Sequence, residues 1–249
     1  MIKAKCDINC PPLDAHVMAY QGNHLYDFDN KLLLTKYPQR VIQYASQEDS
    51  VLELGIGHGF CSEIFSKNFK RHLILEGSIS IIENFQEKNP SISSEILHTY
   101  FENFDSAEKF DVIVMGFILE HVDDPVQLLK KYKKYLSPRG RIFIAVPNAA
   151  SMNRRLGHMA GLLPDLEALS AYDDLLGHKR YYTVDSLKND IAQSGFLIKK
   201  IEGIFLKPLT SRQLGTLNLS DEILDALCEL GKPYPELSCS IFAELKPIQ

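Results

Sequence analysis

One short segment constrains the possible folds of this chain more than any other. Val51-Leu52 leads into the string E-L-G-I-G-H-G at residues 53–59, so an apolar run ends on an acid and three alternating glycines, with a helix-compatible stretch behind them. Glycine permits a backbone turn at positive φ and keeps side chains away from a bound ligand. The following helix begins with backbone N–H groups that have no partner inside the helix. The segment therefore predicts a strand, a turn and a helix that bind a nucleoside-bearing cofactor.

The acid at position 53 distinguishes between cofactors. A carboxylate at the strand end repels a pyrophosphate, which dinucleotide sites hold against a glycine-rich turn and a helix N-terminus. It attracts an ammonium or sulfonium group instead. The E-x-G-x-G-x-G string resembles the first motif of the class I S-adenosylmethionine-dependent methyltransferases. The resemblance implies that Glu53, Gly55, Gly57 and Gly59 contact S-adenosylmethionine.

Two later strings resemble the same family. The string G-F-I-L-E-H-V-D-D-P at residues 116–125 is similar to the segment that follows the strand beside the methyl group in small-molecule methyltransferases. The string L-S-P-R-G at residues 136–140, before the apolar run 141–148, resembles the turn that leads into their fifth strand. The resemblance is nearest to ubiquinone-biosynthesis-like O-methyltransferases. It implies methyl transfer to a small-molecule acceptor, with oxygen expected, and with nitrogen or a non-catalytic cofactor-binding protein as alternatives.

A nicotinamide-dependent dehydrogenase shares this type of sheet but fits the sequence poorly. A G-x-G-x-x-G register needs a small residue at position 60, where Phe60 stands. The Tyr-x-x-x-Lys string on which short-chain dehydrogenases rely is also absent from the sequence.

Apolar runs alternate with amphipathic stretches from residue 51 onward, and this rhythm predicts a parallel sheet with helices on both faces. A late strand that is reached through the poorly periodic residues 207–237 can run antiparallel, like the last strand of the resembling family. We therefore expect a Rossmann-like, doubly wound α/β fold with a seven-stranded, mostly parallel sheet. The expected strands are 51–54, 72–75, 94–98, 110–115, 141–146, 196–201 and 239–245, and the expected helices are 60–68, 79–88, 125–136 and 184–194.

The sequence suggests two parts. Residues 1–50 are expected to form a helical extension, in which Pro38 should interrupt or restart a helix over residues 29–45. Residues 51–249 are expected to form the methyltransferase domain. The stretch 149–182 is too long for an ordinary connection and is interpreted as a lid insertion, and residues 207–237 as a second insertion.

The second expected strand ends on Glu76, about twenty residues beyond the glycines, which is the spacing expected for an acid that binds ribose hydroxyls. Gly77 and Ser78 begin the next turn and are expected near the cofactor. The alternative is that Glu76 only complements a helix dipole, but Ser78 is the better N-cap.

The third expected strand leads to Phe101 and Glu102, which suit an apolar adenine face and its exocyclic amine. Glu102 could equally be a solvated loop acid. Phe117 follows the fourth strand and is expected to border the cofactor pocket. In the string that follows, Asp123 or Asp124 should cap a helix that begins at a proline, while Glu120 and His121 are expected to have structural or supporting roles.

The expected lid contains the string G-H-K-R-Y-Y-T at residues 177–183, which resembles an element of the same enzymes. His178 is the candidate general base, since the ordinary pKa of imidazole suits that role. A histidine that merely packs the lid is the alternative. The basic residues of the lid could bind an anionic acceptor or be solvated charges; they are Arg154, Arg155, Lys179 and Arg180. One of the N-terminal side chains Tyr20, His24 and Tyr26 could close over the cofactor.

Composition disfavours some partners. The formal net charge of −5 provides no basic surface for nucleic acid. The longest uncharged apolar run, residues 112–119, is too short for a membrane span, and the N-terminus lacks an apolar leader region, so we expect a cytoplasmic protein. The five cysteines are scattered, and a Cys6–Cys10 pair supplies too few ligands for structural zinc, so free thiols and no metal are expected.

Overall fold

The computed structural model describes residues 27–248. Tyr20, His24 and Tyr26, any one of which could close over the cofactor, lie outside the described residues, as does the Cys6–Cys10 pair. The helices of the described range are α1 (Asp27–Tyr44), α2 (Phe60–Asn68), α3 (Ile79–Lys88), α4 (Pro125–Lys133), α5 (Met152–Met159), α6 (Ala171–Leu176), α7 (Val184–Gln193), α8 (Ser211–Thr216) and α9 (Asp221–Gly231). Its strands are β1 (Ser50–Leu54), β2 (Arg71–Glu76), β3 (Glu95–His98), β4 (Phe110–Gly116), β5 (Leu136–Pro147), β6 (Phe196–Ile204) and β7 (Ser240–Pro247).

The strands form one seven-stranded sheet in the order β3-β2-β1-β4-β5-β7-β6. Neighbouring strands from β3 to β5 pair in parallel, whereas β7 lies between β5 and β6 and pairs antiparallel with both. The predicted α/β fold and its antiparallel last strand are thereby confirmed. The order reverses at β1 and β4, and in sheets of this type ligands bind beyond the carboxyl ends of the strands at such a point.

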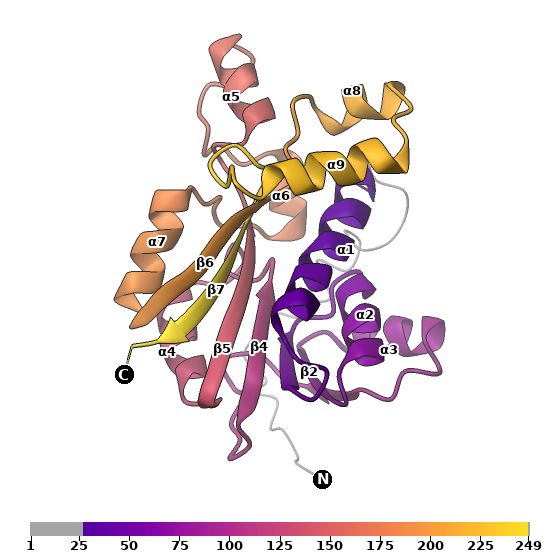
Figure 1. The fold of residues 1–249 in the computed structure, drawn as a ribbon, viewed down its shortest axis with the longest axis vertical. Coiled ribbons are helices and arrows are strands. Elements are labelled where there is room, and N and C mark those ends of the chain that lie inside the picture. Colours follow the sequence, from indigo (N-terminus) through magenta and orange to yellow (C-terminus); the bar gives the residue numbers. More distant parts are fainter. Residues whose placement is uncertain (1–26, 249) are drawn as a thin grey trace.

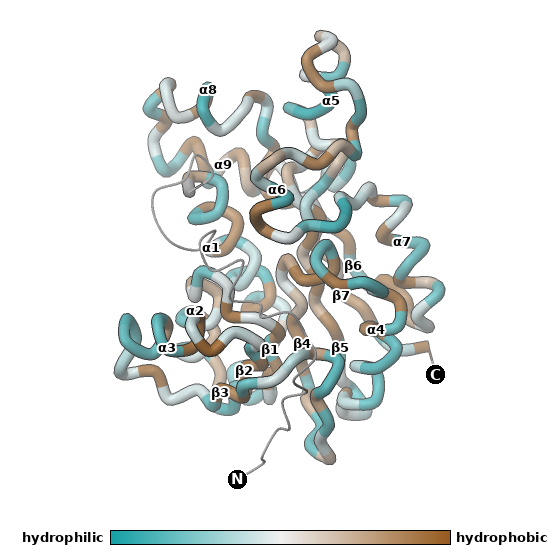
Figure 2. Tube along the Cα trace, turned by 180° about the vertical axis from the view of Figure 1, so that it is seen from behind, coloured by the Kyte–Doolittle hydropathy of each residue, from teal (hydrophilic) through white to brown (hydrophobic). Residues whose placement is uncertain are grey.

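Helices cover both faces of the sheet, with α1, α2 and α3 on one side and α4 and α7 on the other (Figure 1). Residues of β1, such as Val51 and Leu52, alternate between two hydrophobic cores, one shared with α1 and α2 and the other with α4 and α7. The strands carry most of the hydrophobic colour, and the outer helices α3 and α7 carry much of the hydrophilic colour (Figure 2).

Helix boundaries follow from capping. Ser78 caps α3 by accepting a hydrogen bond from the backbone N–H of Ile81, and Asp124 caps α4 by accepting one from Gln127. Pro125 occupies the first turn of α4, where its missing N–H removes no helical hydrogen bond. The capping role predicted for the acid before Pro125 is confirmed, and it belongs to Asp124.

The expectation for Pro38 was wrong, because α1 runs through it without a break. A proline inside a helix leaves the carbonyl four residues earlier without its usual donor. Here that carbonyl belongs to Leu34, and it accepts a hydrogen bond from the Cys61 thiol of α2 at 3.3 Å. Tyr37 and Val41 are fully or almost fully buried on either side of the proline and anchor both halves of the helix to the core.

The expected turn at residues 136–140 is also different in the structure. Helix α4 ends at Lys133, and Leu136 already pairs with Phe110 as the first residue of β5. An irregularity in the β4–β5 pairing between Phe110 and Val112 accommodates the proline and glycine within the strand. Turn residues therefore mark a bulge here rather than the end of an element.

The two expected insertions contain α5 and α6, and α8 and α9, respectively. These four helices gather at the end of the sheet where its parallel strands finish (Figure 1). None of the helices within residues 27–248 is long and apolar enough to cross a membrane.

Candidate active site

A pocket of about 870 Å³ opens at the carboxyl ends of the central strands. Its lining comes from the glycine turn, the ends of β2 and β4, helix α1 and both insertions. Of the residues predicted to bind the cofactor or to act as the general base, those that line it are Glu53, Gly55, Gly57, Gly59, Glu76, Phe101, Phe117 and His178. The described lining residues do not include Gly77, Ser78 or Glu102.

The turn between β1 and α2 requires its glycines. Gly55, Gly57 and Gly59 have φ values of 79°, 53° and 85°, in the region that side chains with a Cβ rarely adopt. A Cβ on Gly55 would lie 2.9 Å from Cδ1 of Ile118. Glycine therefore permits both the conformation and the close approach of the β4 loop, and the turn exposes backbone rather than side chains to the pocket.

Glu53 lies at the end of β1 with only 3% of its surface exposed. Its Oε2 lies 3.0 Å from Nε2 of His72, and Nδ1 of His72 lies 2.9 Å from Oγ of Ser94. The neighbouring strand thus holds the carboxylate in place. Because Glu53 also lines the pocket, its orientation is fixed before any ligand binds.

Glu76 at the end of β2 is held by backbone donors. The N–H of Ile56 donates to Oε2 at 2.9 Å and the N–H of Ser78 to Oε1 at 2.8 Å. Burial raises the pKa of the Glu76 carboxyl above its ordinary value, and the backbone hydrogen bonds act in the opposite direction. The carboxyl thus joins the glycine turn to the start of α3 and borders the pocket.

Phe101 and Glu102 separate in space although they are adjacent in sequence. Phe101 lines the pocket, and its carbonyl accepts a hydrogen bond from the Tyr132 hydroxyl at 3.0 Å. Glu102 is exposed, and its backbone carbonyl accepts a hydrogen bond from Lys131. A role for the Glu102 side chain in adenine recognition stays a prediction without support from its position.

Phe117 has a φ of 59°, which is strained for a residue with a large side chain. The backbone is held there because the N–H of Phe117 donates to the carbonyl of Ala145 at 2.7 Å. Tyr37 from α1 packs edge-on against Phe117, and a Cβ on Gly116 would lie 2.4 Å from the Tyr37 ring. Helix α1 therefore presses on the end of β4 and forms a wall of the pocket. The sequence had not identified Tyr37.

His178 is held by Asp173, a residue that sequence reasoning missed. Nδ1 of His178 lies 2.8 Å from Oδ1 of Asp173, and the Tyr181 hydroxyl donates to both oxygens of Asp173 at 3.0 and 3.1 Å. Burial alone would raise the pKa of Asp173, but hydrogen bonds from His178 and Ser170 hold it well below its usual range. The only local signal was the spacing of Ser170 and Asp173, which form the capping box of α6.

Glu120 and His121 also line this end of the pocket. Glu120 is completely buried, and neither of its carboxylate oxygens has a hydrogen-bond partner in the described part of the chain. Burial raises the pKa of the Glu120 carboxyl to about 7, although the neighbouring His178 imidazole lowers it. The rings of His121 and His178 lie 4.7 Å apart between their centroids. Their positions at the pocket go beyond the structural roles expected from sequence.

The basic residues of the 149–182 insertion are mostly engaged by the protein. Arg154 donates to the carbonyls of Leu166 and Ala168 and lies over the Tyr181 ring, 4.3 Å from its centroid. The other three, Arg155, Lys179 and Arg180, bond to the Ala150 carbonyl, the Asp123 carboxylate and the Asp123 carbonyl, respectively. Hydrogen bonds within the insertion and to the α4 loop account for these charges.

A buried polar contact joins α1 to the second insertion at the pocket. Lys207 forms an ion pair with Asp29, and Ser211 donates a hydrogen bond to the same carboxylate oxygen at 2.7 Å. All three residues line the pocket. Sequence reasoning missed this group because Asp29 lies 178 positions from Lys207 and neither belongs to a motif.

Comparisons with known proteins agree with this geometry. A family model described as a methyltransferase domain matches residues 26–200, well over half of the chain. The ubiquinone biosynthesis O-methyltransferase of Parvibaculum lavamentivorans is 32% identical over 109 residues, which cover 43% of this chain and 41% of that protein. The mitochondrial ubiquinone biosynthesis O-methyltransferase of Schizosaccharomyces pombe is 21% identical over 169 residues, 64% of this chain and 59% of that protein. The matched segments thus span less than two thirds of these relatives.

Solved structures share the fold. An S-adenosylmethionine-dependent methyltransferase from Mesorhizobium loti superposes with a TM-score of 0.57 at 16% identity, over 85% of this chain and 99% of that one. A possible histamine N-methyltransferase from Thermotoga maritima gives 0.58 at 16% identity, over 91% of this chain and 99% of that one. The family match, the sheet order and the glycine turn lead to one assignment. The chain belongs to the methyltransferase-domain family, as a class I methyltransferase with S-adenosylmethionine as its cofactor.

Proposed function

We propose that this protein transfers the methyl group of S-adenosylmethionine to an oxygen atom of a small molecule, and that His178 is the general base. The observation that carries the proposal is the Asp173–His178 pair at the pocket. An ionised carboxylate only accepts hydrogen bonds, so the His178 proton lies on Nδ1, toward Asp173. Nε2 therefore keeps its lone pair and can accept a proton from an acceptor.

The cofactor would occupy the end of the pocket formed by the glycine turn. Glu76, fixed by two backbone donors, is suited to accept the ribose hydroxyls, and Phe101 offers an apolar surface for adenine. Glu53 is a fixed negative charge near the turn and would attract the ammonium or sulfonium group. Gly77 and Ser78 would contribute indirectly, because Ser78 caps α3 and donates its backbone N–H to Glu76.

Methyl transfer from a sulfonium is an in-line displacement. The acceptor oxygen forms a bond to the methyl carbon, the carbon–sulfur bond breaks, and its electron pair remains on sulfur in S-adenosylhomocysteine. The hydroxyl proton passes to Nε2 of His178. The protein mainly has to align the two reactants and exclude water. Alignment alone can supply a large part of a rate enhancement, as well-oriented intramolecular reactions show.

The relatives support oxygen as the acceptor atom. The similar curated proteins are named ubiquinone biosynthesis O-methyltransferases, although the matched segments cover less than two thirds of them. The solved structures include enzymes named N-methyltransferases, but their low identity supports the fold alone. A nitrogen acceptor is the alternative that the assay must include.

Two measurements on the full chain test the proposal. Isothermal titration should detect S-adenosylmethionine binding, and S-adenosylhomocysteine should form in the presence of a catechol rather than a primary amine. Replacement of His178 by Ala should lower turnover by at least ~100-fold and leave cofactor binding unchanged, in line with general-base catalysis. The matched control is His158→Ala, because the His158 side chain is exposed and its ring bonds the Leu163 carbonyl within the 149–182 insertion. Undiminished turnover in His178→Ala would exclude His178 as the base.

A further inference from the structure

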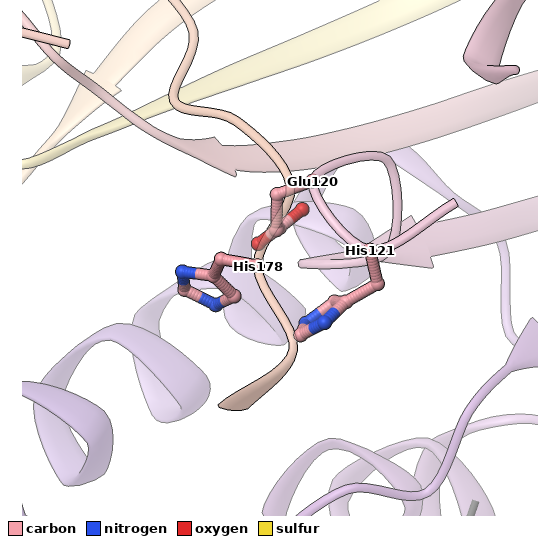
Figure 3. Close-up of side chains that lie close together, drawn as sticks. All are labelled: Glu120, His121 and His178. Carbon is pink, nitrogen blue, oxygen red and sulfur yellow. The ribbon is translucent and has the colours of Figure 1, made fainter. Parts of the chain in front are cut away.

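Three side chains with metal-binding chemistry meet at the end of the pocket that contains His178, which we call the acceptor end because the methyl acceptor is proposed to bind there. Each of Glu120, His121 and His178 offers one ligand atom, and these three atoms all lie within 4.8 Å of one another. Figure 3 shows the carboxylate and the two imidazoles facing a common space. Glu120 and His121 come from the loop after β4 and His178 from the segment after α6, so the cluster joins the sheet to the 149–182 insertion.

Within the described part of the chain, no hydrogen bond satisfies the carboxylate of this cluster. Glu120 is completely buried, and both of its oxygens are without a partner among residues 27–248. A buried carboxylate without hydrogen bonds is costly, and proteins commonly solve this by pairing it or using it to coordinate a metal. Glu76 is also buried at this pocket, but both of its oxygens accept backbone hydrogen bonds. Burial alone therefore does not explain why the Glu120 oxygens lack hydrogen bonds among the described residues.

The histidine of the insertion is oriented as a metal ligand is. Its Nδ1 faces the Asp173 carboxylate at 2.8 Å, so Nε2 remains as the electron-pair donor. A carboxylate behind a histidine fixes the tautomer and the ring orientation and makes the imidazole a better ligand. Asp173 itself is held by Tyr181 and by Ser170, so this support is rigid.

We propose that Glu120, His121 and His178 bind a divalent transition-metal cation, whose open coordination positions face the acceptor. Two imidazoles and one carboxylate favour zinc or a neighbouring first-row metal over magnesium or calcium, which prefer oxygen ligands. Three protein ligands leave room for water or substrate, as in catalytic rather than structural sites. The sequence analysis predicted no metal. His178 is 57 positions from His121, and only the folded chain brings them together.

The consequence for catalysis rests on the proposed methyl transfer, whereas binding of the cation does not. In the metal-loaded protein Nε2 of His178 is a ligand, so the cation replaces the imidazole as the group that favours the deprotonated acceptor. A bound cation would favour loss of the acceptor's hydroxyl proton to solvent. The oxygen would then form its bond to the methyl carbon as the carbon–sulfur bond breaks, and no electron would be transferred to or from the cation.

Cobalt titration tests the site directly. The full chain, stripped with a chelator and dialysed, is titrated with Co²⁺, whose visible absorption reports ligation by nitrogen and oxygen. We expect one equivalent to bind with a change in these bands, and Zn²⁺ to displace it. The variants Glu120→Gln and His178→Ala should each weaken binding by at least ~10-fold, and Asp173→Asn by roughly 10- to 100-fold through the orientation of His178. His158→Ala is the matched control and should bind as the unmodified chain does.

The outcomes separate this inference from the proposed function. Retention of S-adenosylmethionine binding by each variant establishes that it is folded. Stoichiometric Co²⁺ binding that is unaffected by Glu120→Gln and His178→Ala would overturn the metal site, as would the absence of binding to the unmodified chain. Metal binding at the cluster without methyl transfer would support the inference and remove the proposed function. Full turnover in chelator would support the proposed function and overturn the role of the cation in catalysis.

Discussion

The buried carboxylates at the two ends of the pocket differ in their hydrogen bonding. At the cofactor end, Glu76 accepts two backbone hydrogen bonds and Glu53 lies 3.0 Å from the imidazole of His72. At the acceptor end, Glu120 has no hydrogen-bond partner in the described range although it is completely buried. The cofactor end is therefore complete without a ligand, whereas the acceptor end holds a polar group that lacks a partner. Such incomplete satisfaction is expected where a ligand is bound and where chemistry takes place.

The largest effect should come from removal of the satisfied carboxylate. Glu76→Ala leaves the buried N–H groups of Ile56 and Ser78 without an acceptor, and each such loss costs roughly 1–3 kcal/mol. We expect chemical denaturation to show a loss of about 2–4 kcal/mol in the free energy of unfolding, together with loss of S-adenosylmethionine binding. At the exposed Glu102, the control substitution Glu102→Ala should change stability by less than about 0.5 kcal/mol. Equal losses of stability in Glu76→Ala and Glu102→Ala would contradict a stabilising role for the hydrogen bonds of Glu76.

Glu120→Gln should raise the free energy of unfolding at neutral and higher pH, whereas Glu76→Ala should lower it. Because burial raises the folded-state pKa to about 7 from an ordinary 4.5, the folded protein binds more protons than the unfolded chain between these values. Stability should therefore fall as the pH rises from about 4.5 to about 7, by up to about 3 kcal/mol in total. The neutral glutamine should abolish this loss in the cation-free protein and make the variant the more stable of the two above pH 7. Identical pH dependence of unfolding would contradict the account of Glu120.

Asp173→Asn tests the support of the histidine. An amide at this position can donate to Nδ1 of His178 and so favour the wrong tautomer. Turnover should fall by roughly 10- to 100-fold with a shifted pH–rate profile, while S-adenosylmethionine affinity stays unchanged. A purely structural role in capping α6 would instead lower thermal stability without moving the pH profile.

Gly55→Ala should have the smallest effect of the series. Its positive φ costs about 1–2 kcal/mol for a residue with a Cβ, and the new atom would approach Ile118. We expect S-adenosylmethionine to bind more weakly in titration calorimetry. Gly161→Ala is the matched control, because Gly161 has a similar φ of 72° with no atom within 4 Å of the added Cβ. It should lose stability but bind the cofactor normally.

The elements that the sequence predicted best are those defined by local signals. Helices α2 and α3 have the predicted bounds, because a glycine with positive φ precedes the first and Ser78 caps the second. The path of α1 through Pro38 could not be predicted, since the thiol that satisfies the free carbonyl comes from another helix. The cofactor end is likewise mostly local, as Glu53, the three glycines and Glu76 lie within one strand–turn–helix unit and the next strand.

The acceptor end depends on contacts that sequence spacing does not reveal. His178 carried a motif resemblance, but its partner Asp173 belonged to no motif and Glu120 was expected to have a structural or supporting role. Both gain their chemical character from burial, because the 149–182 insertion folds over the end of β4. Tyr37 and Asp29 also enter the pocket, because α1 packs against the end of β4 and pairs with Lys207 of the second insertion.

The central claim is that one pocket contains a cofactor end and a separate acceptor end to which His178 belongs. Its most direct test measures cofactor affinity and the rate of S-adenosylhomocysteine formation for His178→Gln under saturating S-adenosylmethionine. The account predicts an unchanged dissociation constant and a rate lowered by at least ~100-fold. An unchanged rate, or loss of cofactor binding together with the rate, would contradict it.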